Sequence, residues 1–208
     1  MKTKTIEAVV FDYGGVLATS QWDAFADFER RHGLEPGGLV PHFAVEHDGA
    51  PAWHAIETGH LPWAEFADVV VARAQAAGVA LFDVHDLTAL MPLGALWPMV
   101  HRVRRLKDEG YKLGILTNNV REFADYWQAT IPIELFDVVV DSCEEGIRKP
   151  DPEIYLRTAE RLFVEPKACV FLDDSAANCE AAAAVGMRTI VVGPDIDAAI
   201  AELDALLS

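Results

Sequence analysis

The sequence of 208 residues predicts an α/β fold, in which a doubly wound parallel sheet carries a helical segment inserted after its first strand. Two observations support this prediction. Short apolar runs of β-forming residues alternate with helix-like stretches, which is typical of a parallel sheet flanked by helices. The alternation is interrupted once, between about Ala18 and Leu93, where helical periodicity is cut by turn residues and no convincing strand occurs.

The predicted strands are five short apolar runs, each followed by polar or glycine-containing residues. They cover residues 8–11, 113–116, 138–140, 169–172 and 189–192. The predicted helices of the same region cover residues 99–109, 120–129, 152–162, 176–185 and 196–207. Gly110 and Gly186 stand where the C-caps of two of these helices are expected.

The interruption divides the chain into two predicted parts. Residues 1–17 and 94–208 are expected to form the α/β core, and residues 18–93 are expected to form a helical cap. Because the insertion directly follows the first strand, we expect the cap to lie over the carboxyl edge of the sheet, where open α/β sheets bind ligands. The sequence contains no internal repeat or low-complexity linker that would indicate a further domain.

Composition narrows the choice of partners. The net charge is −16, and a surface this negative repels the phosphate backbone of nucleic acids. The three cysteines lack C-x-x-C spacing, which favours reduced thiols in a cytosol. No apolar run approaches the roughly 18 residues of a membrane span, and the N-terminal run is too short for a signal peptide. We therefore expect a cytoplasmic monomer or homodimer that binds small molecules and neither nucleic acid nor membrane.

Residues with chemical potential gather where the predicted strands end. Asp12 follows the first strand, Thr117, Asn118 and Asn119 follow the second, Asp141 and Ser142 the third, and Asp173 and Asp174 the fourth. Lys149 lies in the loop that leads to the next helix. Since the carboxyl ends of parallel strands share one edge, these carboxylates, hydroxyl and ammonium groups are expected to converge there. Such a set predicts a metal and phosphate site.

The charges in this set suggest what each member does. A phosphate dianion repels a carboxylate nucleophile, so Asp12 can attack only when cations neutralise the phosphoryl oxygens. Mg²⁺ prefers hard oxygen ligands, which Asp12, Asp174 and the backbone carbonyl of Gly14 would supply. Asp173 would bind the metal directly or through water. Lys149 would supply the second positive charge.

Phosphate binding also draws on uncharged groups. The Thr117 hydroxyl and neighbouring backbone N–H groups can donate to phosphoryl oxygens, with Asn118 nearby. Gly14 and Gly15 let the backbone pass close to the phosphate without a Cβ in the way. The predicted catalytic residues are thus Asp12, Thr117 and Lys149, and the predicted phosphate-binding residues are Gly14, Gly15, Thr117, Asn118 and Lys149.

Four short motifs contain these residues. They are Phe11-Asp12-Tyr13-Gly14-Gly15-Val16-Leu17, Leu116-Thr117-Asn118-Asn119, Arg148-Lys149-Pro150-Asp151-Pro152-Glu153-Ile154-Tyr155 and Leu172-Asp173-Asp174-Ser175-Ala176-Ala177-Asn178. In order and spacing they resemble the motifs of haloacid dehalogenase (HAD) superfamily hydrolases, and the resemblance covers the whole chain. It implies a Rossmann-like core with the first strand between the second and the fourth. It also implies a helical-bundle cap that controls substrate access and an aspartyl-phosphate intermediate on Asp12.

Within this superfamily the chain resembles small sugar-phosphate phosphatases that begin FD-x-G-N-V, and more distantly the phosphatase domains of soluble epoxide hydrolases. The resemblance implies a Mg²⁺-dependent phosphomonoesterase for a small phosphorylated metabolite. One position departs from the pattern. Most HAD phosphatases carry a second Asp two residues after the nucleophile, as acid for the leaving group and base for water, but here that residue is Gly14. General acid catalysis is typically worth about 10²–10⁴-fold, so efficient turnover is in question.

Two alternatives to the phosphatase stay open. A 2-haloacid dehalogenase shares the fold and the nucleophile, also lacks the second Asp, and needs no metal. Its fourth motif tends to carry neutral residues, so the intact Asp173-Asp174 pair argues against it. A non-catalytic module that holds a phosphometabolite is the other alternative, and Gly14 is its only support.

The remaining polar and aromatic residues receive less specific interpretations. Asn178 is interpreted as orienting the acidic pair. The aromatics Trp22, Trp53 and Trp63 could line a substrate pocket, but aromatics of a small helical bundle more commonly form its core. The cap histidines are His42, His47, His54 and His60, of which His54 or His60 could replace the missing acid. The segment with Asp141-Ser142 and Glu144-Glu145 is interpreted as a solvated turn, and Cys143 as a bystander.

Overall fold

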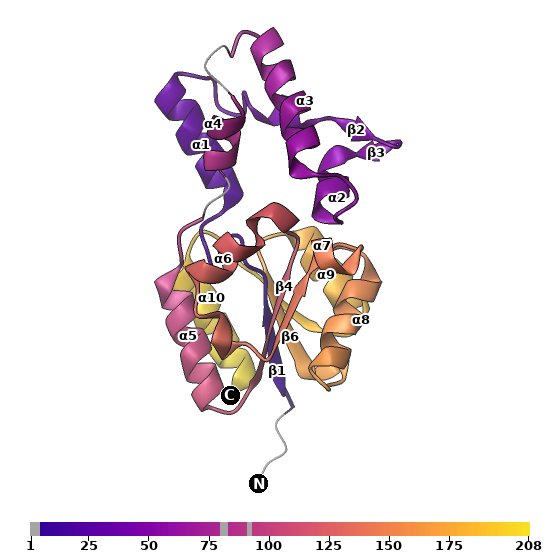
Figure 1. Cartoon of the computed structure of the whole chain (residues 1–208). Coiled ribbons are helices and arrows are strands. Elements are labelled where there is room, and N and C mark those ends of the chain that lie inside the picture. The colour runs from indigo at the N-terminus through magenta and orange to yellow at the C-terminus, as the bar shows by residue number, and fades with distance from the viewer. Residues whose placement is uncertain (1–4, 80–82, 91–92) are drawn as a thin grey trace.

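A five-stranded parallel sheet forms the centre of the molecule, for which a computed structural model describes residues 5–79, 83–90 and 93–208 (Figure 1). Its strands are β1 (Ala8–Phe11), β4 (Lys112–Thr117), β5 (Val138–Asp141), β6 (Cys169–Asp173) and β7 (Arg188–Val191). The order is β5-β4-β1-β6-β7. The five predicted strands are confirmed, and β1 lies between β4 and β6, as the family resemblance implied.

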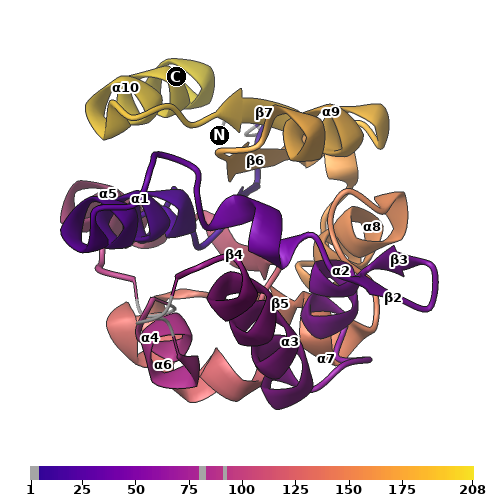
Figure 2. The ribbon, with the colours of Figure 1, turned by 90° about the horizontal axis from the view of Figure 1, so that it is seen from above.

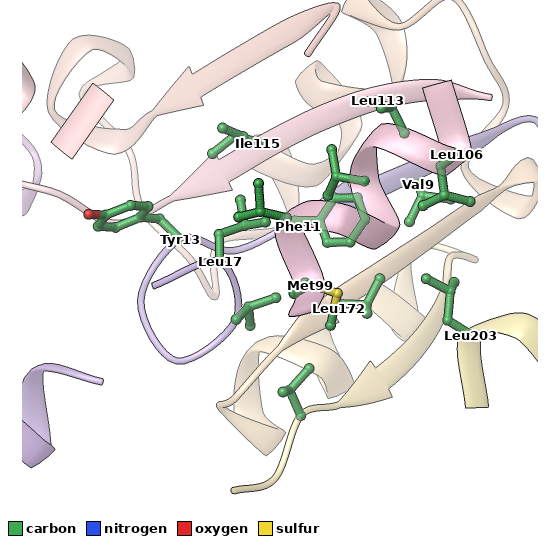
Figure 3. Close-up of a cluster of buried hydrophobic side chains, with 14 of the residues drawn as sticks. Val9, Phe11, Tyr13, Leu17, Met99, Leu106, Leu113, Ile115, Leu172 and Leu203 are labelled. Carbon is green, nitrogen blue, oxygen red and sulfur yellow. The ribbon is translucent and has the colours of Figure 1, made fainter. Parts of the chain in front are cut away.

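Strand β1 is fully buried because helices cover both faces of the sheet. Val9 and Phe11 face a core cluster shared with α5 (Trp97–Asp108) and α10 (Ile196–Leu207) (Figure 3). Ala8 and Val10 face the opposite cluster, which includes residues of α8 (Pro152–Arg161) and α9 (Ala176–Ala184). Burial on both faces explains why this strand is a continuous apolar run rather than an alternating one.

Local signals in the sequence set the ends of these helices. The Ser175 side chain accepts a hydrogen bond from the Asn178 N–H and so caps the N-terminus of α9. Gly110 and Gly186 follow α5 and α9 with φ of 80° and 99°, as expected of glycines that end helices. The predicted helix 120–129 is interrupted, because it consists of the 3₁₀ turn η2 (Arg121–Phe123) followed by α6 (Ala124–Thr130). Two further 3₁₀ turns are η3 (Ile133–Leu135) and η4 (Pro166–Ala168).

A second layer of helices lies above the carboxyl edge of the sheet (Figure 1 and Figure 2). It comprises α1 (Gln21–His32), η1 (Val40–Phe43), α2 (Ala52–Glu57), α3 (Trp63–Ala76) and α4 (Val84–Ala89), which we call the upper layer. The upper layer has its own core, with Leu39, Phe66 and Leu87 fully buried. Of the expected core and cap segments, residues 1–4, 80–82 and 91–92 lie outside the described residues.

The upper layer also contains a short antiparallel hairpin, so the expectation of no strand between residues 18 and 93 is wrong. Strands β2 (Glu46–His47) and β3 (Ala50–Pro51) pair through a turn at Asp48 and Gly49. These two residues have φ of 50° and 78°. An Asp-Gly pair is a preferred two-residue hairpin turn, because both positions tolerate positive φ. The strands are too short and too polar to produce an alternating apolar pattern.

Helix α7 (Ser142–Glu145) joins the two layers, which corrects the interpretation of this segment as a solvated turn. Ser142 is fully buried and its hydroxyl donates to the backbone carbonyl of Glu57 in α2, at 2.5 Å. Glu145 forms ion pairs with Arg157 and Arg161 of α8. Cys143, which was interpreted as a bystander, is a buried free cysteine. Among the described residues, no helix combines the length and the apolar character that crossing a membrane requires.

Candidate active site at the carboxyl edge of the sheet

The side chains at the ends of β1 and β6 meet around a buried lysine. Asp12 directly follows β1, and its backbone N–H donates to the Leu172 carbonyl of the neighbouring strand. The Lys149 Nζ lies 2.9 Å from Asp12 Oδ1 and 2.6 Å from Asp173 Oδ2. The Lys149 side chain is only 1% exposed, so both contacts form away from water. The structure thus brings together three of the predicted site residues.

Burial and charge determine the protonation of this cluster. Burial raises the pKa of Asp12 to about 7, an effect that Lys149 opposes and that the charges of Asp173 and Asp174 reinforce. Burial by itself lowers the pKa of Lys149, but the facing carboxylates of Asp12 and Asp173 outweigh it and raise that pKa. Three carboxylates therefore surround one ammonium group. A further cation beside Asp12 would relieve their repulsion and favour its carboxylate form.

The donor set of this cluster fits a hard divalent cation. Asp12, Asp173 and Asp174 each offer one carboxylate oxygen, and these oxygens lie within 4.8 Å of one another. Carboxylate oxygens are the ligands that Mg²⁺ prefers. Both Asp173 oxygens are already engaged, since Asn178 Nδ2 donates to each of them at 3.0 and 3.1 Å. This favours Asp12 and Asp174 as direct ligands, and the position of Asn178 matches its predicted orienting role.

Asn118 lines the same pocket as Asp12, and its side-chain amide is bound to the backbone of Lys149. Its Oδ1 accepts from the Lys149 backbone N–H at 2.8 Å, and its Nδ2 donates to the Lys149 carbonyl at 3.0 Å. The amide therefore holds the backbone of Lys149 in place. Thr117, at the end of β4, is 2% exposed and lines the same pocket as Asp12.

The two glycines of the first motif differ in what they require. Gly15 has φ of 73°, and a Cβ there would overlap the carboxylate of Asp174. Gly15 thus needs to be glycine for both conformation and space. Gly14 has no positive φ, and among the described residues a Cβ at this position would meet only Leu93 Cδ1, at 3.8 Å. The described part of the site therefore has room for a Cβ at position 14.

A pocket of about 580 Å³ extends from this cluster to the upper layer. Asp12, Lys149 and Thr117 lie at one end, and residues of α1, η1 and α2 line the other. Of the three tryptophans considered, Trp22 and Trp53 line this pocket, whereas Trp63 is buried in the upper-layer core. The described lining includes none of the four cap histidines, which are His42, His47, His54 and His60.

Two charged residues of the pocket lining, Glu57 and Arg148, received no role from the sequence. Glu57 of α2 accepts hydrogen bonds from Arg148 Nε at 2.6 Å and from Trp53 Nε1 at 2.9 Å. Arg148 precedes Lys149 in the third motif, which is the only signal that could have pointed to it. Conversely, Asp141 does not join the cluster around Asp12. It is buried where it accepts from Trp127 Nε1 at 3.2 Å and caps α7.

Comparison with protein families gives the class to which this arrangement belongs. Residues 6–186 match the family of haloacid dehalogenase-like hydrolases. Because this match covers most of the chain, the protein belongs to that family and is a hydrolase. The cluster at the sheet edge accordingly represents its candidate active site.

Three curated relatives illustrate the range within the family. The chain is 30% identical over 98% of its length to Acyl-CoA dehydrogenase family member 10 of Mus musculus, but spans only 19% of that protein. It is 31% identical to Phosphatase MT3486 of Mycobacterium tuberculosis, covering 97% of this chain and 95% of the relative. It is 28% identical to Validoxylamine A 7'-phosphate phosphatase of Streptomyces hygroscopicus, covering 97% of this chain and 92% of the relative.

Solved structures support the same fold. A HAD family enzyme from Bacteroides thetaiotaomicron, solved in complex with magnesium and inorganic phosphate, superposes with a TM-score of 0.67 at 23% identity, covering 91% of this chain and 96% of that one. The L-2-haloacid dehalogenase from Xanthobacter autotrophicus superposes with a TM-score of 0.65 at 19% identity, covering 98% and 84%. Both structures thus share the fold of this chain.

Proposed function

We propose that the protein is a Mg²⁺-dependent phosphomonoesterase that acts on a small phosphorylated metabolite through an aspartyl-phosphate on Asp12. The observation that carries the proposal is the buried cluster at the floor of the pocket, where Lys149 contacts Asp12 and Asp173. Two relatives that this chain matches over nearly their whole length are phosphatases, which supports the same class. The adjacent acidic pair Asp173-Asp174 favours a metal-dependent reaction over dehalogenation.

In the proposed reaction, an Asp12 carboxylate oxygen forms a bond to phosphorus while the bond from phosphorus to the leaving oxygen breaks. Water then attacks phosphorus, which releases inorganic phosphate and restores the carboxylate. Lys149 and the Thr117 hydroxyl bind phosphoryl oxygens. Bound Mg²⁺, held by Asp12, Asp174 and the Gly14 carbonyl with Asp173 directly or through water, would offset the phosphate charge.

Position 14 limits this chemistry. Without a carboxyl there, no group at that position protonates the departing oxygen or activates water. We therefore expect kcat/KM to depend steeply on the pKa of the leaving group. By leaving-group pKa alone, and apart from how the pocket binds the organic group, aryl, acyl and anomeric sugar phosphates should react far better than simple alkyl phosphates. Release of phosphate from Asp12 is expected to be slow for the same reason.

We also propose that the molecule divides into an α/β core, residues 1–17 and 94–208, and a cap, residues 18–93, with the pocket between them. The position of the upper layer above the sheet edge supports this division. We further propose that the enzyme is cytoplasmic, because its three cysteines are unpaired. We propose a monomer or a homodimer as its oligomeric state. Its charge of −16 argues against nucleic acid as a substrate.

An assay with p-nitrophenyl phosphate tests the proposed function. We expect turnover that EDTA abolishes and Mg²⁺ restores, and Asp12→Asn is expected to abolish it while the protein stays folded. Chloroacetate turnover that persists in EDTA would instead support the dehalogenase. Phosphate binding without any turnover would support the non-catalytic module. A folded Asp12→Asn variant with most of its activity would rule out Asp12 as nucleophile.

A further inference from the structure

We propose that the pocket selects phosphate monoesters whose organic group is large and apolar rather than rich in hydroxyls. This inference rests on the proposed function and names the substrate class for the same site. It is drawn from the part of the pocket beyond the Asp12 cluster, where the organic group of a bound phosphate ester would lie. Three features of that part carry it: its aromatic wall, its engaged polar groups and its size.

The aromatic wall is continuous across three elements of the upper layer. Trp22 meets Phe25 edge-to-face with ring centroids 5.8 Å apart, and Phe25 lies 4.9 Å from Phe43. Phe43 in turn meets Trp53 at 5.8 Å. All four line the pocket. Trp22 is 63% exposed, so its ring is available to cover an apolar ligand at the pocket mouth.

The polar side chains among these aromatics already have partners inside the protein. Gln21 Nε2 donates to the Leu90 carbonyl at 2.6 Å. The Ser20 hydroxyl oxygen accepts the Trp22 N–H at the start of α1. Glu57 is bound by Trp53 and Arg148. A ligand rich in hydroxyls would compete with these internal hydrogen bonds, which costs binding energy, whereas an apolar group would leave them intact.

The dimensions of the pocket fit such a group. Its volume of about 580 Å³ lies within the range of roughly 300–1,000 Å³ in which proteins bind drug-sized ligands. Val120 and Phe123 of the sheet layer also line the pocket and add to its apolar lining. A phosphate at Asp12 therefore leaves room for an aromatic or branched aliphatic group against an apolar surface.

Turnover of 4-alkylphenyl phosphates measures this selectivity, because a 4-alkyl substituent barely changes the leaving-group pKa. From phenyl through 4-butylphenyl to 4-hexylphenyl phosphate, kcat/KM is expected to rise by about three- to fourfold for each methylene that becomes fully buried. A counterpart with a terminal hydroxyl on a chain of the same length is expected to be worse than its alkyl partner. Equal or better turnover of the hydroxylated series would overturn the proposal.

Two tryptophans give a matched pair of variants. Trp22→Ala is expected to lower kcat/KM on 4-hexylphenyl phosphate by about tenfold, because it removes an aromatic contact. Trp97→Ala is the control: Trp97 is 54% exposed on α5 and lies outside the described pocket lining. We expect no change in that variant. Equal effects of the two substitutions would argue against a role of the wall in binding.

A binding measurement separates this inference from the proposed function. Calorimetric titration of the wild-type protein with methyl-, butyl- and hexylphosphonate in Mg²⁺ requires no turnover. If no phosphate ester is hydrolysed but affinity still rises with alkyl length and falls in Trp22→Ala, the proposed function fails and the apolar pocket stands. If esters are hydrolysed but neither affinity nor kcat/KM depends on alkyl length, the proposed function stands and this inference is wrong.

Discussion

Lys149 and the three carboxylates around it form the centre of the candidate site. A single ammonium contacts Asp12 and Asp173 in a buried position, while Asn118 fixes the backbone of Lys149 and Asn178 fixes Asp173. Each of these contacts restricts the orientation of a group that would face a phosphate. Preorganised charges of this kind are what phosphoryl transfer requires, since positioning and electrostatic stabilisation supply most of the catalysis.

The adjacent glycines of the first motif allow a prediction at single residues. Gly14→Asp is expected to restore an acid for the leaving group, because position 14 has ordinary φ and, in the described part of the chain, its Cβ would meet only Leu93 Cδ1. Turnover of alkyl phosphates should then rise by about 10²-fold or more and the dependence on leaving-group pKa should flatten. Measured kcat/KM across leaving groups of different pKa checks both.

Gly15→Ala is the matched control for this experiment. At position 15 the positive φ and the overlap with Asp174 both oppose a side chain, so activity is expected to fall. A folded Gly14→Asp variant with the wild-type dependence on leaving-group pKa would indicate that another group already acts as the acid. The histidines His54 and His60 are poor candidates for it, since neither is part of the described pocket lining.

At the scale of secondary-structure elements, helix α7 connects the two layers. Its N-cap is Asp141, whose carboxylate accepts from the Cys143 N–H, and its first residue donates to the carbonyl of Glu57 in α2. Burial raises the pKa of Asp141, against which its hydrogen bonds act. The folded protein therefore favours the protonated form of this carboxyl more than the unfolded chain does.

Asp141→Asn is expected to change how stability depends on pH. A carboxyl with a raised folded pKa binds more protons when folded, so its contribution to stability is fully present below its unfolded pKa of about 3.9 and falls as pH rises towards the folded value. Asn keeps the acceptor for the cap and does not titrate. The stability of the wild type relative to the variant should decrease from pH 4 upwards.

Urea unfolding at several pH values, with EDTA throughout, provides this measurement. Asp108→Asn can serve as a control because Asp108 is exposed at the end of α5. A pH-independent difference between wild type and Asp141→Asn would contradict the assignment of a raised pKa to Asp141.

The elements differ in how far they could be predicted from the sequence. The three central strands β1, β4 and β6 were predictable because burial on both faces makes each one a compact apolar run, and parallel pairing then brings Asp12, Thr117 and Asp173 to one edge. The hairpin at Asp48-Gly49 was missed because its strands are only two residues long, although the turn itself was a usable signal.

The upper layer was harder to predict because the contacts that decide its role are formed between layers. Trp22 and Trp63 both lie in the first turn of a helix, but Trp63 packs into the upper-layer core and Trp22 lines the pocket. Glu57 carries no motif, and its importance arises only from Arg148, which lies 91 positions away in the chain. Helical periodicity identifies the buried face of a helix, but not which layer covers it.

At the scale of the whole molecule, the excess of carboxylates at the site predicts that bound Mg²⁺ raises the stability of the folded protein. Mg²⁺ that binds the folded form alone stabilises it by about 2.7 kcal/mol at 100 times its Kd. For a chain of this size, thermal unfolding should then shift upwards by about 5 °C or more. Differential scanning calorimetry with and without Mg²⁺ measures the shift. Asp174→Ala should reduce it strongly, and an equal shift in that variant would place the metal elsewhere.

The central claim is that Asp12 becomes covalently phosphorylated, and acid-quenched mass spectrometry tests it most directly. Because Gly14 leaves no carboxyl to activate water, the aspartyl-phosphate should accumulate during turnover of p-nitrophenyl phosphate. We predict a peptide that contains Asp12 and carries the mass of one phosphoryl group, formed with the kinetics of the product burst and absent in Asp12→Asn. Steady turnover with no phosphorylated peptide, or with the phosphoryl group on another residue, would contradict the account.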